Sequence, residues 1–135
     1  MKTEALQIRP LEAGDIEPMR SLARRIWQAH YPGIITHAQI EYMLEQRYRA
    51  DVVRDELACD GLWWELATLP GEPVGFSSCL LTGEGEMKLD KLYVDPRKHG
   101  GGIGSRLLES VRARARSLDC GRLVLGVRDN GPGLQ

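Results

Sequence analysis

The sequence predicts an α/β fold in which a mixed sheet, antiparallel at its centre, is flanked by helices. Hydrophobic residues recur with the period of a helix between about residues 16 and 57. From residue 62 the pattern changes to short apolar runs that are separated by turn residues. A run of glycines then joins a predicted strand at 86–94 to a second helical stretch that ends near Leu118.

The first half is predicted to hold one strand and two helices. Asp15 is expected to cap the first helix, and Thr36 with Gln39 three residues later has the spacing of a capping box. The predicted elements are a strand at 6–9, a helix at 16–29, a second helix with the stripe Ile40, Met43, Leu44 and Tyr48, and a helical turn at 52–57.

The second half is predicted to alternate strands with a single helix. We expect strands at 63–68, 74–81 and 86–94, a helix from Ile103 to Leu118 and a last strand at 122–127. Consecutive strands joined by short turns pair antiparallel, whereas a strand that follows a crossover helix pairs parallel. At 135 residues the chain, 1–135, is predicted to be a single domain.

Composition excludes several classes of function. The formal net charge of −1 argues against a nucleic-acid partner, and no apolar run is long enough to cross a membrane. The N-terminus lacks the apolar core of a signal peptide, which favours a cytoplasmic location. Cys59, Cys79 and Cys120 are far apart, so we expect small buried hydrophobic side chains and no metal site.

The segment His99–Ser105 is the most informative part of the chain. A strand that turns through consecutive glycines into a helix leaves several backbone N–H groups unpaired at the positive end of the helix dipole. The expected guest is a phosphate or a pyrophosphate. The segment matches neither the P-loop motif nor the dinucleotide-binding motif. Counted from Gly100, the second glycine of the first motif and the third glycine of the other both fall on Ser105.

The spacing His99-x-x-Gly102-x-Gly104 fits the pattern Gln/Arg-x-x-Gly-x-Gly/Ala. Together with the preceding Leu92-Tyr93-Val94-Asp95-Pro96 and the helix that follows, this segment resembles motif A of the GNAT superfamily of N-acetyltransferases. The resemblance implies the acyl-CoA N-acyltransferase fold, acetyl-CoA as co-substrate and no metal. It also implies transfer of an acetyl group to a primary amine of a small molecule (polyamine or amino-acid-like) or of a peptide.

The resemblance also assigns cofactor-binding residues. The backbones of Leu92, Tyr93 and Val94 would line the pantetheine arm, with the Leu92 N–H as donor to the thioester oxygen. His99 stands where Gln or Arg is more common in the family. The diphosphate would lie against the backbone of Gly100, Gly101, Gly102, Ile103, Gly104 and Ser105.

Other side chains are candidates for contact with the cofactor or with the acceptor. Arg97, Lys98 and Arg106 could each add positive charge near the phosphates. His30 and Tyr31, at the end of the first helix, are expected to line the acceptor pocket or to lie on the surface.

The general base is expected on the strand at 86–94. Simple alternation places Glu86, Lys88, Asp90 and Leu92 on one face. The carboxylate that relatives often use falls on Lys88, so Asp90, acting through water, is the first choice and Glu86 the second. A salt bridge from Asp90 to Lys88 or to Lys91 is the alternative.

The end of the sequence departs from the family pattern. The family continues with an Asn, a helix and a Tyr that protonates the leaving thiolate. Here Asn130 comes one residue early, Gly131 takes its place and no Tyr follows. The resemblance therefore implies a fold cut short after the fifth strand, with a homodimer that covers the exposed sheet edge. The alternatives are a catalytically impaired acyl-CoA-binding or regulatory remnant of the family, and a dimerising interaction module.

Overall fold

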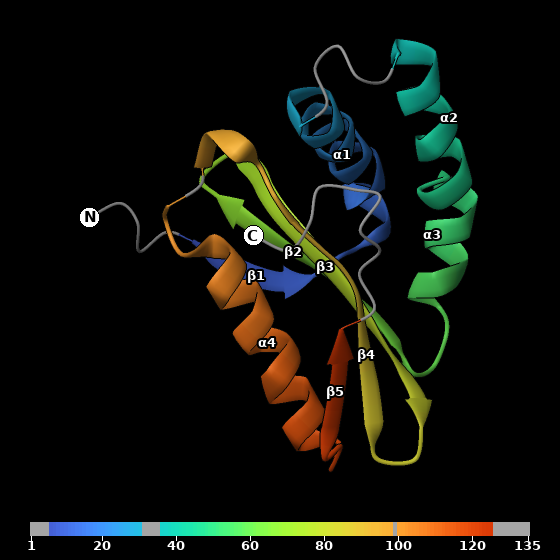
Figure 1. Ribbon diagram of the computed structural model, residues 1–135, viewed down its shortest axis with the longest axis vertical. Helices are drawn as coiled ribbons and strands as arrows, with labels where there is room; N and C mark the ends of the chain where they lie inside the picture. Colours follow the sequence, from blue (N-terminus) through green and yellow to red (C-terminus); the bar gives the residue numbers. More distant parts are fainter. Residues whose placement is uncertain (1–5, 31–35, 99, 126–135) are drawn as a thin grey trace.

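The computed structural model describes residues 6–30, 36–98 and 100–125. Within these ranges five strands form one sheet in the order β1-β2-β3-β4-β5, with helices on both faces (Figure 1). The elements are β1 (Gln7–Pro10), the 3-10 turn η2 (Ala13–Asp15), α1 (Ile16–His30), α2 (His37–Arg47), α3 (Ala50–Leu57), β2 (Leu62–Leu69), β3 (Glu72–Gly83), β4 (Glu86–Val94), the 3-10 turn η3 (Pro96–Lys98), α4 (Ile103–Ser117) and β5 (Arg122–Leu125).

The predicted fold class is confirmed. Neighbouring strands pair antiparallel from β1 to β4, and β5 joins β4 in parallel after the crossover through α4. The helical turn that the sequence predicts at 52–57 is part of a longer helix, α3, which makes two turns. The last strand is described as far as Leu125, so the rest of its predicted span and the expected departures at Asn130 and Gly131 lie outside the described residues.

Two predicted caps have different outcomes. The capping box at α2 is confirmed, because the Thr36 hydroxyl accepts from the Gln39 N–H and the Gln39 side chain accepts from the Thr36 N–H. Asp15 instead closes the turn η2, where its carboxylate accepts from the Glu12 N–H and pairs with Arg9 at 2.7 Å. The chain therefore enters α1 through a 3-10 turn, which the helical period alone does not reveal.

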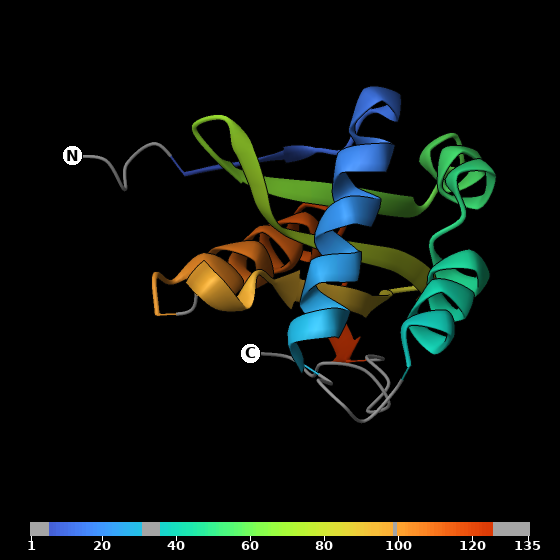
Figure 2. The same ribbon diagram turned by 90° about the horizontal axis from the view of Figure 1, so that it is seen from above.

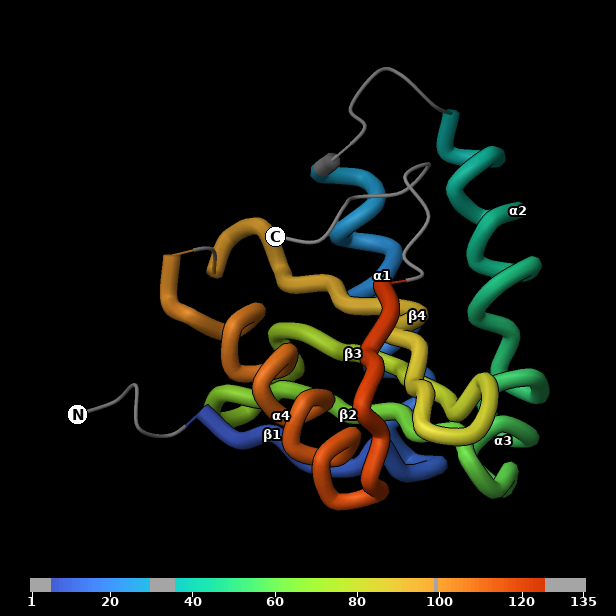
Figure 3. Tube along the Cα trace, turned by 60° about the horizontal axis from the view of Figure 1, so that its bottom comes forward, coloured from blue at the N-terminus to red at the C-terminus, as the bar shows by residue number. Residues whose placement is uncertain are grey.

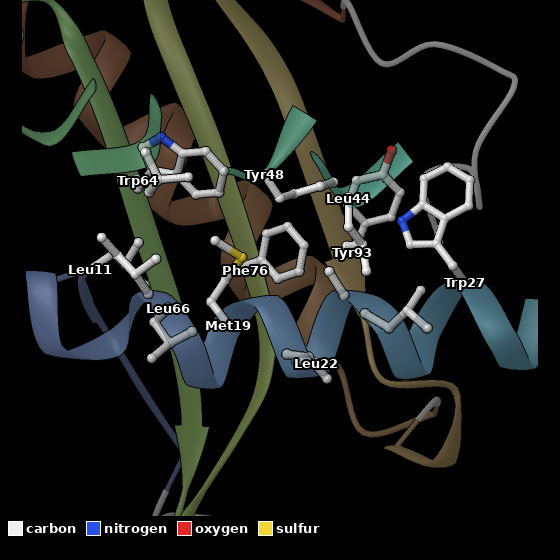
Figure 4. Packing of buried hydrophobic residues seen from close by; sticks show 14 of the residues in the cluster. Leu11, Met19, Leu22, Trp27, Leu44, Tyr48, Trp64, Leu66, Phe76 and Tyr93 are labelled. Carbon is white, nitrogen blue, oxygen red and sulfur yellow. The ribbon is translucent and has the colours of Figure 1, made fainter. Parts of the chain in front are cut away.

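One face of the sheet is covered by α1, α2 and α3 and is rich in aromatic side chains. Figure 2 shows α2 and α3 together along one side of α1. Phe76 of β3 lies at the centre, with ring centroids 5.6 Å from Tyr93, 5.9 Å from Tyr48 and 6.1 Å from Trp64 (Figure 4). All four rings are buried, so they hold the three helices to the sheet through apolar area and ring contacts.

The opposite face is covered by α4. The residues at 100–105, which we call the glycine segment, lead into this helix and form its first turn. Its buried residues recur every four positions: Ile103, Leu107, Val111 and Ala115. A buried polar contact adds to this packing. Glu65 of β2 accepts from the Ser110 hydroxyl at 2.6 Å and from Arg114 at 2.9 Å. These contacts fix the direction of α4 and therefore of its N-terminus.

Gly75 lets α4 approach β3 closely, which leads to a stability prediction. A Cβ at this position would lie 3.0 Å from the Tyr93 carbonyl oxygen and 3.2 Å from the Leu107 side chain. Gly75→Ala should therefore lower the free energy of unfolding by about 1–3 kcal/mol, because a backbone carbonyl cannot easily move aside. Urea denaturation measures the change. Gly83→Ala on the same strand is the matched control, since nothing lies within 4 Å of its Cβ, and an equal loss there would contradict the prediction.

The cysteines differ in environment, so the expectation that all three are buried is confirmed for Cys79 alone. Cys79 is buried, Cys120 is partly exposed and Cys59 is exposed. Burial raises the pKa of the Cys79 thiol to about 11. Among the described residues no cluster of His, Cys, Asp and Glu is suited to a metal ion, and no helix is long and apolar enough to cross a bilayer.

Candidate functional site

A bulge in β4 shapes the site. β4 pairs with β3 over its whole length, but the register shifts in the middle. Lys91 lies opposite Ser78 and Leu89 lies opposite Cys79, so the intervening Asp90 has no counterpart on β3. An extra residue of this kind reverses the alternation of side chains beyond it.

The bulge overturns the prediction that Leu92 shares a face with Asp90. Beyond the bulge, Leu92 and Val94 pack in the α4 cluster, whereas Tyr93 packs in the cluster under α1. Lys91 follows Asp90 on the face of α1, and its Nζ lies 2.7 Å from the Asp90 carboxylate. Strict alternation fails here because it assumes a regular strand.

The second half of β4 has an open edge. β5 pairs only with residues 86–89 of β4, so in the described part of the chain no strand lies beside residues 90–94 on that side. Figure 3 shows β4 continuing past β5 towards the glycine segment. The Asp95 N–H donates to the Val74 carbonyl of β3. Because hydrogen-bonding directions alternate along an antiparallel strand, the N–H groups of Leu92 and Val94 face the open edge.

The glycine segment lies directly beyond this edge. Gly100 and Gly102 have φ values of +92° and +79°, in the left-handed region that favours glycine. Gly102 is the N-cap of α4 and provides no side-chain cap. A cavity of about 330 Å³ is lined by Val94, Lys98, Gly100, Gly102, Ile103, Gly104 and Ser105. The loop therefore combines free space with a helix N-terminus whose N-cap residue has no capping side chain, which is the arrangement of an anion site.

The three basic side chains near this cavity are not equivalent. Lys98 pairs with Glu72 at 3.2 Å, and Arg97 pairs with Asp95 at 2.7 Å. Arg106, in the first turn of α4, is exposed and has no ion pair within the described part of the chain. Arg106 is therefore the cation best able to meet a ligand phosphate.

Asp95 ties the end of β4 to η3. Its side chain is 2% exposed, and its Oδ1 accepts from the Arg97 N–H at 3.0 Å. Its carbonyl accepts from the Lys98 N–H, so the chain turns sharply before the glycines. Burial alone would raise the pKa of Asp95, but hydrogen bonds from the side chain and backbone of Arg97 hold the pKa below its ordinary value.

This lowered pKa predicts loss of stability in acid. The carboxylate of Asp95 is favoured in the folded state, so its contribution is complete above the pKa of the unfolded chain, which is about 3.9, and disappears as pH falls through the folded pKa. Urea midpoints measured from pH 7 to pH 2 should therefore decline below pH 4. Asp95→Asn should be less stable at pH 7, by about 1–3 kcal/mol, and should decline less in acid. An unchanged acid profile in the variant would contradict the prediction.

The two candidate bases on β4 differ in their surroundings. Asp90 is partly exposed and pairs with Lys91, which confirms the predicted salt bridge to Lys91. Glu86 accepts from the Thr82 hydroxyl at 2.9 Å and faces Arg122 of β5 at 3.6 Å. Glu86 and Asp90 are four steps apart along the strand, which places their Cα atoms about 13 Å apart. Asp90 therefore lies beside the open edge of β4, and Glu86 lies beside β5.

Sequence reasoning gave Lys91 only as a possible ion-pair partner of Asp90 and missed its contacts with the aromatic rings. Its side chain is 8% exposed, and its Nζ lies over the rings of Trp64 at 5.2 Å and Tyr48 at 5.8 Å. The sequence shows Lys91 next to Asp90, but it does not show the bulge that turns Lys91 towards these rings.

Other predicted residues can be placed only in part. His30 is the last residue of α1, while His99 and Tyr31 lie outside the described residues. The structure brings Val94 next to the glycine segment, since Val94 lines the same cavity as Gly100, and Leu92 packs in the same cluster as Ile103.

Comparison with known proteins identifies the family. The model of the acetyltransferase (GNAT) family matches residues 17–134. The chain belongs to this family. Among solved structures, the PaiA N-acetyltransferase of Thermoplasma acidophilum in complex with coenzyme A has a TM-score of 0.78 at 22% identity, covering 85% of this chain and 74% of that one. The GNAT fold predicted from the sequence is therefore confirmed.

Two relatives are similar in sequence to this GNAT chain. The peptidyl-lysine N-acetyltransferase YjaB of Salmonella typhimurium is 40% identical over 79 residues, which cover 56% of this chain and 50% of that protein. The thialysine N-epsilon-acetyltransferase of Bos taurus is 29% identical over 134 residues, covering 92% of this chain and 75% of that protein. The match to the bacterial relative thus spans half of its length.

Proposed function

We propose that the chain transfers an acetyl group from acetyl-CoA to a primary amine of a small molecule or peptide. The observation that carries the proposal is the junction of the open edge of β4 with the glycine segment that caps α4. This junction offers backbone donors along an extended path and then an anion site at its end. Membership of the GNAT family and the coenzyme A complex of the PaiA structure support acetyl-CoA as the donor.

The donor would lie along this path in two parts. The diphosphate would accept from backbone N–H groups of residues 100–105, and Arg106 in the first turn of α4, which has no ion pair among the described residues, would add positive charge. The pantetheine arm would pair with the edge amides of Leu92 and Val94. The Leu92 N–H would then donate to the thioester oxygen, where negative charge develops as the amine attacks.

Asp90 would accept the proton that the acceptor amine must lose. The ammonium first gives a proton to the carboxylate through water, and the free amine then attacks the thioester carbonyl. The carbon–sulfur bond would then break, and the coenzyme A thiolate would leave and take up the second proton, which the attacking nitrogen loses as the amide forms. Asp90 is preferred to Glu86 because it borders the open edge, whereas Glu86 is held by Thr82 and Arg122. We infer that Lys91 holds the Asp90 carboxylate in place.

The acceptor is proposed to carry its amine at the end of a flexible chain. The two sequence relatives are named for acetylation of peptidyl-lysine and of thialysine at Nε. A polyamine, an amino acid of this kind or a lysine peptide would each present such an amine. His30 and Tyr31 remain our candidates for the acceptor pocket.

Two measurements test the proposed function. Calorimetry should detect acetyl-CoA binding, and a thiol-release assay with spermidine, lysine, thialysine and a lysine peptide should detect turnover with at least one amine. Binding without turnover of any amine would favour the acyl-CoA-binding remnant. Absence of binding would refute the proposal, and dimerisation that depends on concentration would then favour an interaction module.

A further inference from the structure

A second cavity lies on the other side of η3 from the glycine segment. It measures about 330 Å³ and is lined by Arg25, Gln28, Ala29, Asp95, Pro96 and Arg97, which we call the arginine pocket. It shares no lining residue with the cavity at the glycine segment, although η3 contributes to both. Figures 1 and 3 both show η3 between the end of α1 and the start of α4.

The arginine pocket has more positive than negative charge. Its single carboxylate, Asp95, is already bound by Arg97, which donates from one terminal nitrogen at 2.7 Å and from Nε at 3.2 Å. Arg25 approaches the same carboxylate from α1, but its nearest nitrogen lies 3.8 Å away. That separation is an ion pair without a hydrogen bond. Two guanidinium groups therefore share one carboxylate.

Arg25 also has an unused donor. Its Nε is buried, and no acceptor lies within hydrogen-bond distance of it in the described part of the chain. Buried N–H groups without a partner are uncommon in folded proteins, and such a group often marks the place of a water or an ion. The side chain as a whole is 42% exposed, so a ligand in the cavity can reach its guanidinium.

We propose that the arginine pocket binds a phosphate monoester through Arg25 and Arg97. Guanidinium groups donate two parallel hydrogen bonds to phosphate oxygens, and two guanidiniums can meet one phosphate from different sides. This inference rests on the proposed function, under which the glycine segment beyond η3 holds a diphosphate. Acetyl-CoA carries a third phosphate, on the ribose 3′ position, and this phosphate is the occupant that we assign to the pocket.

Calorimetry with two donors tests the assignment. Wild-type protein should bind acetyl-CoA about tenfold or more tightly than acetyl-3′-dephospho-CoA, the effect expected for a hydrogen bond to a charged group. Arg25→Gln should weaken the binding of acetyl-CoA and leave that of acetyl-3′-dephospho-CoA unchanged, so that the two affinities become nearly equal. Arg25→Lys should keep part of the preference for acetyl-CoA. Arg112→Gln is the control, because Arg112 lies on α4 and pairs only weakly with Glu109 at 3.9 Å.

A second arm distinguishes a free phosphate from the phosphate of the donor. Inorganic phosphate should raise the melting temperature of wild-type protein more than that of Arg25→Gln if the pocket takes a separate phosphate. Equal affinity for the two donors, together with no such difference, would overturn the proposal while leaving acetyl-CoA binding intact. If neither donor binds, the proposed function fails, and the inorganic phosphate arm still decides whether the pocket binds phosphate.

Discussion

Gly102→Val should weaken acetyl-CoA binding on the order of 100-fold or more, which is the loss of one or two hydrogen bonds to a charged group. Gly102 has φ +79° and is the N-cap of α4. A β-branched residue avoids this conformation, so the loop should rearrange and its N–H groups should no longer converge on the diphosphate. Calorimetry measures the loss.

The control for this variant is Gly85→Val. Gly85 lies in the turn between β3 and β4 with φ +73°, and, as at Gly102, nothing lies within 4 Å of the position its Cβ would take. The two substitutions therefore impose similar backbone strain, about 1–2 kcal/mol each, at different places. Gly85→Val should lose stability and keep its affinity. If both variants bind acetyl-CoA as the wild type does, the glycine segment is not the diphosphate site.

Asp90→Asn should lower kcat on the order of 10²–10⁴-fold, the usual contribution of a general base. Asparagine has nearly the same shape as aspartate but cannot take the proton of the acceptor ammonium. The dissociation constant of acetyl-CoA should stay within about twofold, since the donor path uses backbone groups of Leu92 and Val94. Steady-state kinetics with the best amine, beside calorimetry, measure the two quantities.

Glu86→Gln provides the comparison for the base. Both carboxylates belong to β4 and both are about 30% exposed, at 29% for Asp90 and 30% for Glu86. Since Asp90 pairs with the nearly buried Lys91, a urea curve must show that Asp90→Asn remains folded. A large loss of kcat in Glu86→Gln with little change in Asp90→Asn would transfer the role to Glu86.

Most of the elements follow from local patterns. α1 is predicted within one residue, because its apolar stripe depends only on the helical period. The span of β4 is predicted correctly from residues 86 to 94, since turn residues bound it on one side and Asp95-Pro96 on the other. β3 is longer than predicted at both ends, because its ends pair with β2 and β4 beyond the apolar run.

Contacts between distant segments decided the remaining features. The bulge at Asp90 arises from the pairing of β4 with β3, and it places Lys91 rather than Leu92 beside that carboxylate. The arginine pocket needs α1 to lie against η3, although Arg25 and Arg97 are far apart in the chain. No periodicity carries this information, because each contact depends on how two elements pack.

The sequence alone predicts the run of glycines and its position between a strand and a helix. A left-handed backbone favours glycine, and the first N–H groups of a helix have no partner within the helix. Which side chains surround that loop, and which acidic side chains its cations face, depended on tertiary packing. Lys98 pairs with Glu72 and Arg97 pairs with Asp95, and only the folded chain brings Glu72 to Lys98. Charge pairing acts through space, so its partners follow from the fold and not from neighbours in sequence.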